Sequence, residues 1–158
     1  PSLRRSIHPP NRRRDTMSAA DDRFAIIATL DCYAECLDTR DWPKLAEVFT
    51  ADAEVDWGEW RQQGLAEVTT SIRSYLDGCG PSQHLLGNYR IELDGDTASS
   101  RHYCRVMHMG KGEHEGKTYE TWIEYADQLV RNGDGWLSRH RHARAIMDQG
   151  DRSLLGPG

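Results

Sequence analysis

The apolar positions of the first forty residues recur at helical spacing. Acidic residues stand at 21 and 22, where a helix N-cap belongs, and the apolar residues that follow are Phe24, Ile27, Leu30, Ala34 and Leu37. This spacing predicts an amphipathic helix over residues 22–38. The sequence Asp41-Trp42-Pro43 then predicts a second helix over about 42–49, because proline suits the first helical position.

A short strand and a third helix are expected next. The segment AEVDWGEW, residues 53–60, predicts a first strand. Gly64 opens a helix that ends at Gly78, and one apolar stripe marks it, formed by Leu65, Val68, Ile72 and Leu76.

Beyond Pro81 the pattern changes to strands. Residues 83–93 and 97–109 are joined by Asp94-Gly95-Asp96, a strong hairpin turn, and residues 118–131 and 136–147 by a second glycine-containing turn. Three helices followed by hairpin-linked strands predict an α+β fold, with the helices packed on a curved antiparallel sheet.

Charged residues are distributed unevenly along the 158-residue chain. The formal net charge is −5, although residues 1–16 hold five arginines against one aspartate. The predicted organisation is a disordered basic extension over 1–19, one folded domain over 20–148 and a flexible tail over 149–158.

Composition also narrows the partners. The acidic body argues against a nucleic-acid partner, which requires clustered Lys and Arg. No apolar run approaches the ~20 residues of a membrane span, and the first residues lack the apolar region of a secretory signal. A cytoplasmic protein without a membrane partner is therefore expected.

Asp38 is a candidate for chemistry at the end of the first helix. It lies on the shoulder of the apolar stripe, and a half-buried carboxylate needs a partner, for which histidine is the useful candidate. The alternative is that Asp38 only ends the helix and accepts hydrogen bonds from nearby amides.

Three histidines lie on the predicted strands. His102 and His108 share one face by strand parity. In the preceding strand the more apolar face holds Leu85, Tyr89, Ile91 and Leu93. Simple burial would therefore turn His84 away from the core, toward solvent.

Four motifs, in order, resemble the scytalone dehydratase-like branch of the SnoaL-like, NTF2-like proteins. These are ECLDTRDWPKL, EVDW, SQHLLGN and RHYCRVMH, within residues 20–148. The resemblance implies a cone-shaped α+β fold around a pocket for a small molecule. It also implies that Asp38 and His84 are a catalytic pair, that His108 is a second active-site histidine, and that Trp57 occupies a catalytic tyrosine position.

The chain departs from that family where hydroxyl donors are needed. The two family tyrosines fall on Leu37 and Trp57, and a polar pair on a later strand falls on Glu124 and Ala126. Similar bile-acid dehydratases carry a tyrosine five residues before the aspartate, which is Tyr33 here. The resemblance therefore implies Tyr33 as the hydroxyl that faces the substrate, with a core tyrosine as the alternative.

Three functions follow as hypotheses. The first is a dehydratase or isomerase without cofactor, in which His84 removes a proton beside a carbonyl, Asp38 orients it, Tyr33 and His108 assist, and Trp57, Asn88 and His102 contact the substrate. The second is a ligand-binding protein or accessory subunit without catalysis. The third is a metal site of histidines and Asp38. Because relatives cover the outer face of their sheet, a homo-oligomer, dimer or trimer, is also expected.

Overall fold

Helix α1, Ala19–Thr39, begins at a capping box in the computed structural model, which describes residues 18–156. The Ser18 hydroxyl accepts a hydrogen bond from the Asp21 amide at 3.1 Å, and the Asp21 carboxylate accepts one from the Ser18 amide at 3.1 Å. The helix predicted over 22–38 is confirmed with slightly wider bounds. Residues 1–17 of the predicted basic extension lie outside the described residues.

The segment after α1 differs from the prediction. Residues Trp42–Glu47 form a short 3-10 helix, and strand β1 then runs over Phe49–Asp56 instead of 53–60. Val48 and Phe49 are buried, so the chain extends here to place both side chains in the core. Gly58, with a φ of 91°, turns the chain into a short strand β2, Arg61–Gln63.

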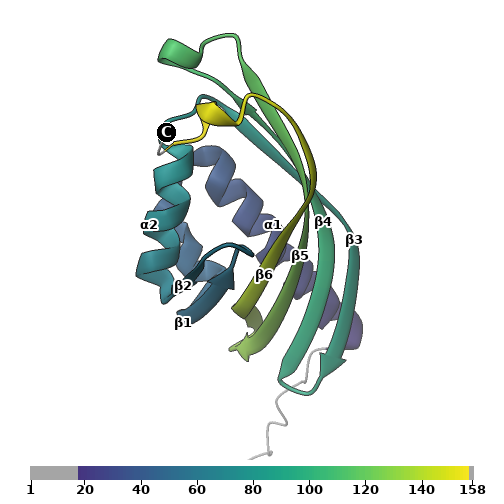
Figure 1. The fold of residues 1–158 in the computed structure, drawn as a ribbon. Coiled ribbons are helices and arrows are strands. Elements are labelled where there is room, and N and C mark those ends of the chain that lie inside the picture. The colour runs from purple at the N-terminus through teal and green to yellow at the C-terminus, as the bar shows by residue number, and fades with distance from the viewer. Residues whose placement is uncertain (1–17, 157–158) are drawn as a thin grey trace, which may run out of the picture.

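The remaining elements match the predicted pattern. Helix α2 spans Leu65–Leu76 and is followed by four long strands, β3 Ser82–Asp94, β4 Thr97–Met109, β5 Thr118–Asn132 and β6 Gly135–Gly150. The sheet order is β2-β1-β6-β5-β4-β3, antiparallel throughout except for the β1–β6 pair. The sheet curves around the helices, and α1 and α2 occupy its concave side (Figure 1).

A β-bulge in β3 reverses which side chains face the helices. Gly87 pairs with Tyr103 and Arg90 with Arg101, so two residues of β3 oppose one of β4, and Asn88 has a left-handed φ of 57°. Before the bulge His84 is buried and Leu85 is exposed, whereas after it Ile91 is buried. The parity expectation that His84 faces outward is therefore wrong, because no single parity holds along the strand.

The C-terminal residues belong to the folded domain. Strand β6 continues to Gly150, and Arg152–Leu154 form a 3-10 turn whose Leu154 is buried in the same core as the α2 residues Val68 and Ile72. Burying a leucine side chain stabilises a fold by about 1.5–3 kcal/mol, which explains why this segment packs back toward α2. Within the expected tail over 149–158, Leu154 thus packs against the domain.

The helices of the described residues were compared with the requirements for crossing a membrane. Within residues 18–156, none of the helices combines the length and the apolar content that a bilayer crossing requires.

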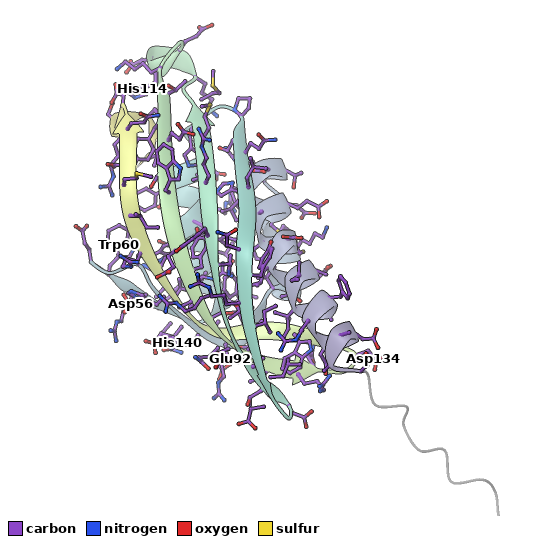
Figure 2. All side chains as sticks on the ribbon, turned by 90° about the vertical axis from the view of Figure 1, so that its right-hand side faces the viewer. Asp56, Trp60, Glu92, His114, Asp134 and His140 are labelled. Atoms are coloured by element: carbon purple, nitrogen blue, oxygen red, sulfur yellow. The ribbon has the colours of Figure 1, made fainter. Side chains whose placement is uncertain are left out.

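The left-handed conformation of Asn88 leads to a test by substitution. Asn88→Gly should keep or slightly raise the free energy of unfolding in urea, whereas Asn88→Val should lower it by about 1–2 kcal/mol, because a β-branched residue is strained at positive φ. Glu92, exposed on the same strand (Figure 2), is the control. At position 92, Glu92→Val should be more stable than Glu92→Gly, because valine favours a regular strand. If glycine were the more stabilising of the two substitutions at both positions, or valine at both, the bulge would be contradicted.

Candidate active site

The Asp38 carboxylate and the His84 imidazole form a hydrogen-bonded pair between the end of α1 and the start of β3. The His84 Nδ1 lies 2.6 Å from Asp38 Oδ1, and the His84 backbone amide donates to both carboxylate oxygens at 3.2 and 3.0 Å. An ionised carboxylate only accepts hydrogen bonds, so Nδ1 carries the hydrogen and Nε2 is the basic nitrogen. The pair has the form of a general base with an orienting carboxylate.

His84 separates Asp38 from a cavity of about 190 Å³ that is partly open to the outside. The side chain of His84 is 4% exposed, while that of Asp38 is 24% exposed and borders a groove outside, between α1 and β3. The cavity lies between α1, α2 and the inner face of the sheet, and aromatic residues form much of its wall, namely Tyr33, Trp57, Trp60, Tyr75, Tyr119 and Tyr125. A histidine therefore reaches a mostly apolar chamber with its carboxylate behind it.

His108 faces the same cavity from β4. Its ring centroid lies 5.6 Å from that of His84, with the rings nearly perpendicular, and its Nδ1 is 2.8 Å from the Ser82 hydroxyl. Burial, together with the nearby His84 and Arg40, lowers the pKa of His108 to about 3. The ring is therefore neutral near pH 7.

Two of the predicted contacts, Tyr33 and Trp57, line the cavity. Tyr33 is completely enclosed, and burial raises the pKa of its phenol to about 12, so it remains a protonated hydrogen-bond donor. Trp57 lies at the end of β1, in the turn that leads to β2, and its indole donates to Gln62. Both side chains therefore form part of the cavity wall.

Asn88 and His102 lie away from the cavity wall. Asn88 is exposed at the bulge, where it borders a shallow groove on the outer face of the sheet. His102 shares the inward face of β4 with His108, but six residues separate them, roughly 20 Å along a strand. Its ring stacks at 5.5 Å on Tyr89 in the core. The structure therefore offers no cavity contact for either residue.

A buried ion pair behind the cavity was missed by the sequence reasoning. Arg141 and Asp127 are both fully enclosed, with Nε and Oδ1 2.8 Å apart, and the guanidinium lies over the rings of Tyr33 and Tyr125 at 4.3 and 4.7 Å. Its Nη1 and Nη2 find no hydrogen-bond partner within residues 18–156. Arg141 stands in the polar run RHRHAR, and its shared strand parity with the small residue Ala143 is the one sequence signal of its burial.

A metal site, the third hypothesis, requires several ligand side chains that lie close together. Within the described part of the chain, no three His, Cys, Asp or Glu side chains come together in an arrangement that could hold a metal ion. His102, one of the suggested ligands, packs in the core between Tyr89 and Tyr125.

Comparison with known proteins agrees with this architecture. Residues 18–142 match the model of the SnoaL-like domain. The chain belongs to the SnoaL-like family. An uncharacterized protein of Mycobacterium tuberculosis is 32% identical over 134 residues, covering 78% of this chain and 86% of the relative.

Solved structures extend the likeness to the fold. A proposed aromatic ring hydroxylase from Novosphingobium aromaticivorans superposes with a TM-score of 0.77 at 27% identity, over 87% of this chain and 99% of the other. A proposed scytalone dehydratase from the same species gives a TM-score of 0.72 at 20% identity, over 82% and 87%. The predicted family and the NTF2-like cone are confirmed.

His102 makes the stability of this SnoaL-like protein depend on pH. Burial lowers its pKa from 6.5 to about 4, so the unfolded chain binds the proton more readily than the folded one. The free energy of unfolding should therefore fall by about 1.4 kcal/mol per pH unit for this group as the pH drops below 6.5 toward 4. His102→Phe should make the decline shallower by that amount, measured by urea unfolding at several pH values.

The control for this measurement is His140→Gln, which changes a half-exposed histidine of β6. It should retain the wild-type dependence. Identical slopes for wild type and His102→Phe would contradict the proposed effect of burial.

Proposed function

We propose that this protein is a small-molecule lyase or isomerase that removes a proton from the carbon beside a carbonyl, with His84 as the general base. The observation that carries the proposal is the Asp38–His84 pair, with Asp38 outside the cavity and His84 on its wall. The scytalone dehydratase proposed among the structural neighbours supports an elimination. No metal or cofactor takes part in the proposed steps.

The first step is proton transfer to His84 Nε2. The C–H electron pair moves toward the carbonyl and leaves an enolate, while the imidazole becomes an imidazolium beside the Asp38 carboxylate. The negative carboxylate stabilises this cation in a mostly apolar chamber. Tyr33, whose pKa of about 12 keeps the phenol protonated, donates a hydrogen bond to the enolate oxygen.

The second step returns the proton. In a dehydration, the enolate expels a hydroxyl group from the β carbon, and the His84 imidazolium gives it the proton, so that water leaves. In an isomerisation, the same proton goes to a more distant carbon instead. His108, being neutral, acts in either case as a hydrogen-bonding group that holds the departing hydroxyl or a water molecule.

The cavity limits the substrate. Its volume of about 190 Å³ compares with the ~150 Å³ of an engineered apolar cavity that holds benzene. A hydroxy ketone with one or two rings therefore suits the chamber better than a larger polycyclic ligand. The aromatic walls favour a flat, apolar ring system.

We also propose that the outer face of the sheet joins copies of this chain, as a dimer or trimer. Of the apolar β3 residues Leu85, Tyr89, Ile91 and Leu93, only Leu85 is well exposed on the outer face. That face is turned toward the viewer in Figure 2. Its exposed apolar residues include Leu85, Tyr103, Met107, Met109, Ile146 and Met147. Neighbouring charges pair among themselves, with Arg105 bound to Glu120 and Glu124 to two arginines, which leaves the apolar surface to drive association.

The general-base assignment can be tested without the natural substrate. Small cyclic ketones in deuterated buffer should exchange their α hydrogens in the presence of the protein, followed by NMR. His84→Ala should slow this exchange roughly 100- to 10,000-fold, and Asp38→Asn should lower it in the same direction, because the histidine loses its orienting acceptor.

Glu35→Gln is the matched control, since it neutralises an exposed carboxylate of α1 that pairs with Lys44 outside the cavity. It should leave exchange unchanged. If the wild-type protein catalyses no exchange and His84→Ala still binds the ketone, the enzyme hypothesis is wrong and the protein is a ligand-binding protein.

The oligomer proposal predicts that light scattering finds a dimer or trimer in solution. Leu85→Glu combined with Met147→Glu should yield a monomer with an unchanged circular dichroism spectrum, because both side chains are exposed on the proposed interface, 59% and 56%. Phe24→Glu, at an exposed position of α1, should keep the oligomer. A monomeric wild-type mass would refute the interface.

A further inference from the structure

Arg40 connects the end of α1 to the start of β3, next to the candidate site. It is the C-cap residue of α1, in a left-handed conformation with φ 61° and ψ 28°. Its guanidinium donates back to the Leu37 carbonyl and forward to the Gly80 carbonyl at 2.9 Å. A third bond, 3.0 Å long, reaches the hydroxyl of Ser82.

Ser82 also contacts His108, so its hydroxyl links Arg40 to the histidine. The two residues are direct partners across β3 and β4, and the hydroxyl lies 2.8 Å from His108 Nδ1. A guanidinium can only donate, so it uses one lone pair of the hydroxyl oxygen. The hydroxyl makes one more contact among the described residues, with Cys79 Sγ at 3.9 Å. Sulfur at this distance is a much weaker acceptor, so the hydroxyl hydrogen is directed to His108 Nδ1.

We propose that Arg40, acting through Ser82, holds His108 as the neutral tautomer with its hydrogen on Nε2, and is thus a positioning residue of the cavity. The positive charge on Arg40 polarises the hydroxyl and makes it a stronger donor to Nδ1. Nε2 is then an N–H donor on the ring that lines the cavity. This arrangement deepens the proposed function but does not depend on it, because the tautomer is a property of the free protein.

The two cavity histidines are then complementary. His84 carries its hydrogen on Nδ1, toward Asp38, and offers Nε2 as an acceptor, whereas His108 offers Nε2–H as a donor. Their ring centroids are 5.6 Å apart, close enough for one small molecule to contact both. The site therefore fits a substrate with an acidic C–H or O–H near a hydrogen-bond-accepting oxygen.

The charged and titratable groups around His108 agree with a neutral ring. His84 faces it from β3, Asp38 and Arg40 from the end of α1, and the Tyr119 ring stacks on it from β5 at 6.3 Å. Burial is the largest cause of its lowered pKa, and Arg40 adds to that lowering while Asp38 opposes it.

The tautomers can be read directly from nitrogen NMR of protein labelled with ¹⁵N-histidine, near pH 7. His108 should show a protonated, pyrrole-type Nε2 and an unprotonated Nδ1, and His84 the reverse, with the signals assigned from His108→Gln and His84→Gln. A protonated Nδ1 on His108 would overturn the proposal.

Arg40→Gly isolates the role of the guanidinium, because glycine accepts the left-handed C-cap without strain and the variant should fold. In it, the His108 signals should shift toward a mixture of tautomers, and the pKa of His108 should rise toward its ordinary value. Ser82→Ala should give the mixed tautomers while Arg40 is still present. Arg40→Lys, which keeps a cationic donor, should restore part of the wild-type spectrum.

Asn88→Gly makes the same backbone change at the other left-handed non-glycine position among the described residues. It should leave the His108 signals unchanged. If Arg40→Gly also leaves them unchanged, Arg40 has no part in setting the tautomer. These outcomes are separate from the ketone exchange assay, which can fail while the tautomer assignment holds.

Discussion

The carboxylate of Asp38 at the C-terminal end of α1 is the constraint on which the site depends. A negative charge is unfavourable there, because the last carbonyl groups already make that end of a helix negative. The amide and the imidazole of His84 supply three hydrogen bonds from β3 and so compensate the charge. This contact aligns the helix with the strand and, in the proposed function, also orients the general base. In that proposal, stability and chemistry share one contact.

The bulge at Asn88 allows one strand to serve two different surroundings. The first half of β3 presents His84 to the cavity, while the second half presents Tyr89 and Ile91 to α1. A regular strand could not do both with this sequence, since its apolar residues change parity near residue 88. The strain of a left-handed asparagine is thus accepted at a position that decides where the catalytic candidate points.

The charges around the cavity are arranged so that its wall holds few of them. Arg141 and Asp127 compensate each other behind the tyrosines, and Asp38 lies behind His84. Tyr33 and His108, both uncharged near pH 7, lie on the wall together with His84. In the proposed reaction, charge that develops on a bound molecule would meet oriented hydrogen bonds from this wall.

The sequence by itself determined the order of the elements, because hydrophobic periodicity and glycine turns are local properties, and the motif resemblance marked Asp38, His84, His108 and Tyr33. It did not reveal the inward direction of His84, the burial of Arg141 or the distance of His102 from the cavity. Each of these depends on a bulge or on packing between strands far apart in the chain. Local patterns record which side chains alternate, but only the tertiary structure decides which of them meet.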